Sequence, residues 1–191
     1  MPTELTPQDK AYLLKLARET ITATVNRQPR SKIAIGELSA ELREFGASFV
    51  TLTIDGQLRG CIGTLEAYQP LALDVQTRAA QAALEDYRFY PVTKDELPLI
   101  KIEISRLTPA QPLTYSEPAE LLGLLRPGID GVVLADGHRR ATYLPQVWEQ
   151  LPNPEEFLSS LCVKMGTSKD LWRQKLLSVE RYQVEEFSEI D

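Results

Sequence analysis

The sequence contains little histidine or cysteine, and this scarcity excludes several kinds of site. Its 191 residues include one histidine, His138, and two cysteines, Cys61 and Cys162. The cysteines lie far apart and neither belongs to a Cys-x-x-Cys motif, which argues against a disulfide framework or a structural zinc site. Any Cys-His or Ser-His-Asp mechanism would have to use His138, which we expect to be solvated in a hairpin turn. The sequence therefore predicts no metal site, and no P-loop or dinucleotide motif indicates a cofactor.

Long apolar runs and basic blocks are also absent. No apolar stretch approaches the length of a membrane span, and the first residues lack the charged-then-apolar pattern of a signal peptide. Acidic residues outnumber basic ones, 27 to 21, giving a net charge of −6. This balance makes general nucleic-acid binding unlikely, although a local basic cleft stays compatible with it. With a hydrophobic content of 43%, the chain can form a core in one domain or two small lobes. We predict a cytoplasmic protein without membrane contact.

Hydrophobic periodicity predicts a mixed α+β fold. The expected helices span residues 7–26, 37–45, 71–87, 119–125 and 154–165, with one more starting at Ser168 or Lys169; the expected strands span residues 48–54, 58–64, 99–107, 131–135, 139–144 and 179–187. Strands in hairpin-like order, interleaved irregularly with helices, favour antiparallel sheets over a doubly wound parallel sheet. A break at Pro109 and Pro112 suggests two lobes, each with an antiparallel sheet flanked by helices. A cleft between lobes is the natural place for a site.

The most informative stretch is a predicted strand with the sequence Leu58-Arg59-Gly60-Cys61-Ile62-Gly63. Two glycines in a strand interior suggest a bulge or a close approach by a ligand or another backbone. Period-two alternation places Arg59 and Cys61 on one face, and a guanidinium near a thiol favours the nucleophilic thiolate. The alternative is that Cys61 serves as a small buried hydrophobe, because free cysteine is often found in protein cores.

Three other places offer polar groups that could act with Cys61. The end of the second long helix carries Asp86 and Arg88 among aromatic residues; Arg88 could bind a carboxylate or phosphate, or could simply pair with Asp86. Ser105 lies on the polar side of a strand, where solvated surface is the default interpretation. Lys164 is near the end of a helix, where a cation also complements the helix dipole. We treat Cys61, Lys164 and Asp86 as catalytic candidates.

The motif resembles the signature of the AMMECR-domain family, Leu-Arg-Gly-Cys-Ile-Gly. Further matches follow in order, at 49–52, 79–89, 104–105, 144–147 and 161–166, so the resemblance covers nearly the whole chain. It implies a single AMMECR-type domain over residues 1–191, with a larger lobe from the N- and C-terminal parts and a smaller lobe from a central insertion. It also implies that the signature side chains turn toward the interface between the lobes.

The resemblance further implies possible partners but no settled activity. Prokaryotic members are often labelled protein A of the AmmeMemoRadiSam system, alongside a Memo-type protein and a radical-SAM enzyme; RNA modification and regulation have been suggested for the family. This chain departs from the family pattern: Tyr87 and Tyr90 stand where the family tends to have proline, and Met165 and Thr167 replace the usual residues around Gly166.

Two classes of function follow. In the first, the protein is an enzyme or a component of an enzyme system, in which Cys61 acts in an inter-lobe site. An anionic or nucleotide-like small molecule would bind there through a set of ligand-binding candidates: Arg59, Gly60, Ile62, Gly63, Arg88 and Ser105. In the second, the protein is a non-catalytic binding or adaptor module, where Gly60 and Gly63 permit close packing and Cys61 fills space. An RNA-modification or regulatory factor is a further alternative.

Overall fold

The computed structural model describes residues 4–189, which form two compact units. Unit 1 contains the chain up to Leu107 and, after a return, the segment from Glu185 onward, whereas unit 2 contains Thr108–Val184. Each unit has its own four-stranded sheet and its own hydrophobic core. The predicted α+β class, with two antiparallel sheets flanked by helices, is confirmed.

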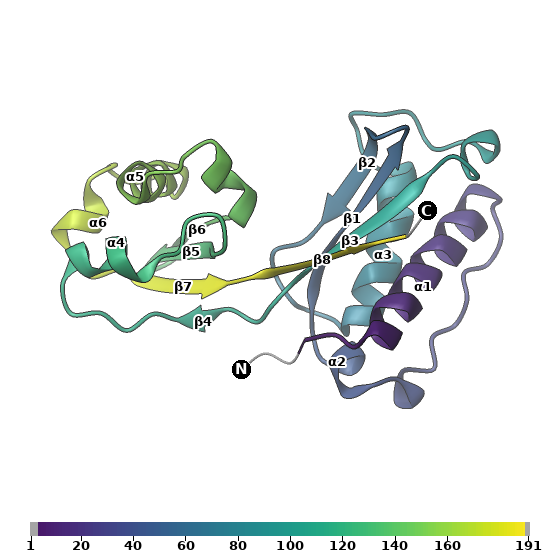
Figure 1. Cartoon of the computed structure of the whole chain (residues 1–191), viewed down its shortest axis with the longest axis horizontal. Coiled ribbons are helices and arrows are strands. Elements are labelled where there is room, and N and C mark those ends of the chain that lie inside the picture. Colours follow the sequence, from purple (N-terminus) through teal and green to yellow (C-terminus); the bar gives the residue numbers. More distant parts are fainter. Residues whose placement is uncertain (1–3, 190–191) are drawn as a thin grey trace. The chain divides into compact units, whose positions relative to one another are not determined.

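Unit 1 is built on a sheet with the strand order β2-β1-β3-β8. The strands are β1 (Ala47–Ile54), β2 (Gln57–Gly63), β3 (Lys101–Leu107) and β8 (Val184–Ser188); the helices are α1 (Pro7–Val25), α2 (Ala40–Arg43) and α3 (Leu71–Leu84), with 3-10 turns η1 (Ile35–Glu37) and η2 (Lys94–Glu96). The long helices α1 and α3 lie beside one another against the same face of the sheet (Figure 1). That face is therefore the core side of unit 1.

Local sequence explains the main elements of this unit. Thr6 caps α1 in a reciprocal capping box with Asp9, and Pro7 occupies the first helical position. Asp55 and Gly56 both have positive φ, 50° and 74°, as a tight hairpin turn between β1 and β2 requires. Strand β1 pairs antiparallel with both β2 and β3. The turn at Asp55-Gly56 thus joins the two strands expected at 48–54 and 58–64 into a hairpin, in register with a third strand.

Alternating residues of β1 and β3 supply the core of unit 1. Val50 and Leu52 on β1, and Ile102 and Ile104 on β3, are fully buried against the helices. Because side chains alternate across a strand, the residues between them point to the opposite face of the sheet. That second face is the one that carries Cys61.

Unit 2 has a second sheet, with the order β4-β7-β5-β6. Its strands are β4 (Gln111–Pro112), β5 (Gly131–Asp136), β6 (Arg139–Tyr143) and β7 (Ser178–Tyr182); its helices are α4 (Leu121–Leu124), α5 (Pro154–Lys164) and α6 (Leu171–Gln174), with 3-10 turns η3 (Pro118–Glu120) and η4 (Pro145–Glu149). Trp148 and Phe157 stack at 3.7 Å between ring centroids in its core. Cys162, on α5, is fully buried there.

The predicted last strand, residues 179–187, is wrong in one respect. The segment forms two strands, β7 in unit 2 and β8 in unit 1, which belong to different sheets. They are separated at Gln183, whose N–H donates to Thr108 Oγ1 at 2.8 Å and whose C=O accepts from Thr108 N–H. Continuous alternation along a sequence does not reveal that a strand changes partners, so the pattern concealed this break.

Two smaller differences concern lengths. Helix α3 ends at Leu84 rather than near residue 87, because Asp86 leaves the helix to bind β2. Strand β4 is too short to give a periodic signal and was not expected. Among residues 4–189, no helix combines the length and apolar character that crossing a membrane requires.

Candidate functional site

Cys61 lies on the face of the unit 1 sheet opposite α1 and α3. In the strand register it is paired with Thr51 on β1, and Thr51 is paired in turn with Glu103 on β3. The three side chains therefore form one row across the sheet. Thr51 Oγ1 donates a hydrogen bond to Cys61 Sγ at 3.3 Å, and the cysteine is partly exposed. The thiol is thus oriented by a hydroxyl group and reachable from solvent.

The backbone of Cys61 is held by the segment that follows α3. Strand β2 is at the edge of its sheet, so the outward N–H and C=O groups of Cys61 have no strand partner. Asp86 Oδ2 accepts the Cys61 N–H at 2.8 Å, and Arg88 Nη2 donates to the Cys61 carbonyl oxygen at 3.4 Å. Two side chains from one short loop therefore satisfy both peptide groups next to the thiol.

Asp86 and Arg88 form a tight ion pair at this position. Arg88 Nε donates to Asp86 Oδ1 at 2.9 Å and Arg88 Nη2 donates to Oδ2 at 2.6 Å. These bonds from Arg88, joined by the Cys61 N–H, outweigh the opposing effect of burial and hold the pKa of Asp86 well below its usual range. The same pairing raises the pKa of Arg88. Asp86 is thus an ionised, buried carboxylate, whereas the Arg88 side chain is 44% exposed.

Arg59 has a carboxylate partner of its own. Its Nε and Nη2 donate to the two oxygens of Glu96 at 2.7 and 3.0 Å. Glu96 also accepts bonds from Thr93 N–H and Oγ1, in a capping box at the start of η2. Hydrogen bonds from Arg59, and then from Thr93, lower the pKa of Glu96 to about 2 despite partial burial. The charge of Arg59 is therefore compensated by Glu96, and the register of β2 shifts beside it, between the partners of Leu52 and Thr53.

The two glycines of the motif are required by close packing. A Cβ on Gly60 would lie 2.3 Å from the carbonyl oxygen of Ala82, on α3. A Cβ on Gly63 would lie 2.2 Å from the ring of Phe49, which covers this glycine from the neighbouring strand. Ile62, between them, packs against the core of unit 1. The sequence suggested a bulge or a close backbone approach at these glycines. The structure has a register shift beside Gly60 and a close approach of the α3 backbone to it.

Of the remaining predicted residues, Ser105 lies on the same face of the sheet as Cys61, whereas Lys164 lies in unit 2. Ser105 is paired with Phe49, one row along the sheet from Thr51 and Glu103, and is buried. Lys164 belongs to unit 2, where its Nζ donates to the Thr142 carbonyl oxygen at 2.9 Å and lies 4.7 Å from the centre of the Tyr143 ring. The structure of unit 1 thus gathers Cys61, Asp86 and Arg88, while Arg59 pairs with Glu96 and lies, like Arg88, near the Phe89 ring.

Two participants in this arrangement were not singled out from the sequence. Thr51 could have been found from the hairpin register, since a two-residue turn at 55–56 fixes which residues face each other. Glu96 could not have been found from the sequence, because its pairing with Arg59 depends on tertiary structure. Glu103 carries a carboxyl whose pKa is raised by partial desolvation and by the charge of Glu186. Within residues 4–189, no group of three or more His, Cys, Asp or Glu side chains could hold a metal ion.

The fold and the motif define the class of the protein: a two-unit α+β chain with a cysteine in the second strand of a β-hairpin, clamped by an Asp-Arg loop. The AMMECR1 family model matches residues 14–187, and the chain belongs to this family. It is similar to a protein from Thermofilum pendens, with 37% identity over 97% of this chain and 92% of the relative. A protein from Methanothermobacter thermautotrophicus shows 36% identity over 93% and 92%.

A solved structure supports the same assignment. The uncharacterized protein PH0010 from Pyrococcus horikoshii has 30% sequence identity and a TM-score of 0.73, covering 93% of this chain and 90% of that chain. The likeness therefore extends over nearly the full length of both chains.

Proposed function

We propose that unit 1 binds an anionic, nucleotide-like small molecule next to Cys61, and that the Cys61 thiol acts on it. The observation that carries this proposal is the arrangement at Cys61: a partly exposed thiol, oriented by Thr51 and fixed through its own peptide groups by Asp86 and Arg88. A reactive group held by supporting hydrogen bonds on a strand is pre-organised, because neither the strand nor the loop has to move for a ligand to meet it.

Arg88 supplies the contact for the anionic group. Asp86 accepts hydrogen bonds from Nε and Nη2 of Arg88. The third nitrogen, Nη1 of Arg88, donates to no acceptor among residues 4–189. A phosphate or carboxylate would bind at this outward nitrogen, with the Asp86 pair fixing the plane of the guanidinium. Since Asp86 already balances the charge of Arg88, the anion gains a directed hydrogen bond more than a net Coulombic attraction.

The neighbours of Arg88 favour a ligand with a planar ring. Tyr87 and Tyr90 are 94% and 92% exposed, although aromatic side chains usually bury much of their surface. Exposed aromatic faces beside an arginine are suited to stacking on a base while the arginine holds a phosphate. These two tyrosines are also positions where the chain departs from the family pattern, so a ring preference would be a property of this chain.

The experiment measures the rate of Cys61 alkylation by iodoacetamide with and without adenosine 5′-monophosphate. We expect the nucleotide to slow alkylation in the wild type and to protect less in Tyr87→Ala and Tyr90→Ala, which remove ring contacts without unpairing a buried charge. Inorganic phosphate should protect more weakly than the nucleotide. Equal protection in wild type and in both tyrosine variants would overturn the stacking, and no protection by either compound would overturn the site.

A second function is favoured by a different observation. Gly60 and Gly63 are both required by packing, and Arg59 and Arg88 are both compensated by carboxylates; a non-catalytic binding or adaptor module needs no more than this. The two functions differ in the consequence of Cys61→Ala. Capture of nucleotide or partner should survive in this variant in both cases. Only an enzyme would also lose turnover.

The remaining assignments rest on the family resemblance or on weaker positions. Memo-type and radical-SAM partners, and a role in RNA modification, are proposals from the resemblance; co-purification from a cell that contains all three proteins tests the first. RNA binding that does not weaken with rising salt would contradict the second, because phosphate contacts release counterions.

Lys164 and Ser105 stay candidates for proton transfer and positioning, tested by turnover once a substrate is known.

A further inference from the structure

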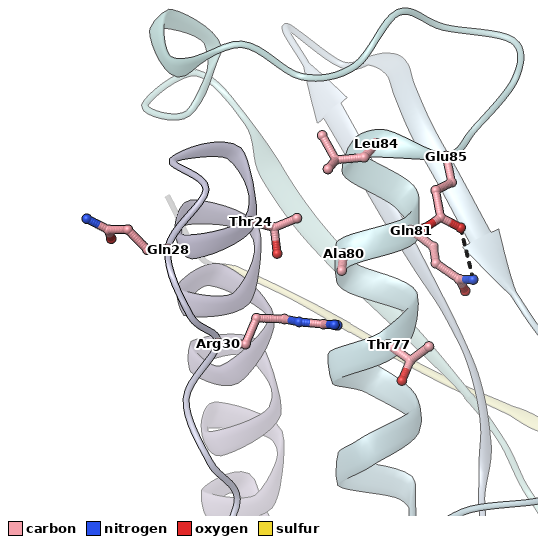
Figure 2. Close-up of a pocket in the computed structure, with 8 residues that line it drawn as sticks. All are labelled: Thr24, Gln28, Arg30, Thr77, Ala80, Gln81, Leu84 and Glu85. Carbon is pink, nitrogen blue, oxygen red and sulfur yellow. Dashed lines mark hydrogen bonds between the residues drawn. The ribbon is translucent and has the colours of Figure 1, made fainter.

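A polar groove lies in unit 1, between α1 and α3. It has a volume of about 330 Å³ and is lined by side chains from both helices and from the segment after α1 (Figure 2). Helix α3 packs against the sheet on one side, so the groove is on the outer side of the helix pair. Ala80 of α3 forms an apolar part of the groove wall. A volume of this size is within the lower range of small-molecule sites.

One cation of the groove lacks a partner. Figure 2 shows Arg30 extending from the segment after α1 toward α3. In the described part of the chain its guanidinium makes no hydrogen bond or ion pair, and no ring lies near it. Arg30 is exposed, whereas part-buried arginines of this unit are paired, for example Arg18 with Glu189 and Arg59 with Glu96. An unpaired guanidinium that lines a groove is suited to a carboxylate, which it can bind through two parallel hydrogen bonds.

A hydroxyl group on the α1 side is also unsatisfied. Thr24 lines the groove, and its Oγ1 is a buried atom without a hydrogen-bond partner in residues 4–189. In contrast, Thr77 on α3 donates to the carbonyl oxygen of Leu73. Buried hydroxyls are normally bonded, so this unsatisfied atom is an unusual feature of the α1 wall of the groove.

The other end of the groove attracts positive charge. Glu85 lines it, at the residue that caps α3, and accepts a hydrogen bond from Gln81 at 3.2 Å. Both helices end here: Thr24 lies in the last turn of α1, and Leu84 is the last residue of α3. Helix C-termini carry a partial negative charge, which adds to that of Glu85 and favours a cationic group. A ligand with negative charge alone would be repelled by this end.

From these four features we infer that the groove between α1 and α3 binds a small amino acid or a similar zwitterion with an apolar side chain. The carboxylate binds Arg30, the ammonium group binds near Glu85 and the helix ends, and the apolar part contacts Leu84 and Ala80. Leu84 is 38% exposed, so a ligand would cover apolar surface that otherwise faces water. This site uses none of the groups assigned to the Cys61 site.

The test uses three related compounds on the full chain, followed by backbone amide NMR. L-leucine carries both charges, 4-methylpentanoate lacks the ammonium group, and 3-methylbutylamine lacks the carboxylate. We expect L-leucine to shift the amide resonances of Gln28, Arg30 and residues 77–85, with the other two compounds binding about tenfold more weakly or worse, since each lacks one charge-assisted hydrogen bond.

Charge-removing variants locate the ligand in the groove. Arg30→Gln and Glu85→Gln should each weaken L-leucine binding by about tenfold, whereas Arg27→Gln, at an exposed cation just outside the groove, should leave it unchanged. The inference is overturned if L-leucine shifts no groove resonance at millimolar concentration. It is also overturned if 4-methylpentanoate binds as tightly as L-leucine, or if Arg27→Gln weakens binding as much as Arg30→Gln.

Discussion

The carboxylate of Asp86 accepts the backbone N–H of Cys61 at 2.8 Å, which takes the place of a neighbouring strand at the edge of the unit 1 sheet. The Arg88 bond to the Cys61 carbonyl oxygen completes this substitution. An uncovered strand edge is a template for pairing with another chain. The Asp86-Arg88 loop therefore protects the edge at the position of the thiol while leaving the side chain accessible.

Removing the Asp86 carboxylate should destabilise unit 1 and release this edge. Asp86 is 4% exposed and holds both Arg88 and the Cys61 N–H. We expect Asp86→Ala to lower the free energy of unfolding by about 2–3 kcal/mol, because it leaves a buried donor unsatisfied and a charge unpaired. Urea denaturation measures the loss, and hydrogen exchange at the Cys61 amide should accelerate. Unchanged exchange at this amide would contradict the clamp, and Asp95→Ala, on an exposed turn residue, serves as the control.

The two cysteines should differ in chemical accessibility. Cys61 is partly exposed on a strand, whereas Cys162 is fully buried in unit 2, where burial raises the pKa of its thiol. Iodoacetamide should add one label to the native protein and two after denaturation, as measured by intact mass, and Cys61→Ser should abolish the native label. Rapid native labelling in Cys61→Ser would show that Cys162 becomes exposed.

Gly60 should not tolerate even a methyl group. The added Cβ would lie 2.3 Å from the Ala82 carbonyl oxygen, which belongs to the backbone of α3 and cannot rotate away. Overpacking of this kind costs about 1–3 kcal/mol or more, so Gly60→Ala should lower the midpoint of urea unfolding clearly. Gly36→Ala is the matched control, because nothing lies within 4 Å of the Cβ that it would add. Equal effects of the two substitutions would argue against close packing of β2 on α3.

The Arg59–Glu96 pair should make stability depend on acidic pH. The pKa of Glu96 in the folded chain is about 2, below its ordinary value of 4.5, so between these values the unfolded state binds more protons. Stability from this pair is therefore complete above about pH 4.5 and is lost as the pH falls toward 2. The full difference corresponds to at most about 3 kcal/mol. Unfolding by urea at several pH values should show this slope in the wild type.

Arg59→Gln isolates that contribution. Without the guanidinium, the largest cause of the lowered Glu96 pKa disappears, and the slope between pH 4.5 and 2 should become shallower than in the wild type. The lowered pKa of Asp86 adds to the slope in both proteins alike, so the difference between them reports Glu96. Parallel curves for Arg59→Gln and wild type would show that Glu96 is not held by Arg59.

The local elements could be predicted from the sequence because their signals are local. The capping box at Thr6 and Asp9, the turn at Asp55-Gly56 and the alternation at Ile102 and Ile104 each depend on neighbouring residues, and each is present. The grouping of Cys61 with Asp86 and Arg88 was predicted only as a set of candidates. Its geometry depends on which backbone groups of β2 lack a strand partner, and this follows from sheet order.

Arg59 shows why charge proximity is difficult to predict from a strand pattern. Alternation predicts a guanidinium on the same face as the thiol, but it gives no sign of the register shift beside Arg59 or of the ion pair that Arg59 forms with Glu96. Glu96 lies far along the chain from Arg59, after α3, and only the tertiary fold brings it close. The break at Gln183 escaped the sequence for the same reason, since strand partners are not encoded by periodicity.

The division of the last extended segment at Gln183 also determines the order in which the protein can be completed during synthesis. Strand β8 closes the unit 1 sheet beside β3, yet the ribosome makes it only after all of unit 2. Until then the edge of β3 is open, and the emerging chain carries an exposed strand that can pair wrongly with a neighbouring chain. Unit 2 has no such dependence, since all four of its strands precede β8, so we expect it to fold while unit 1 still awaits its final strand.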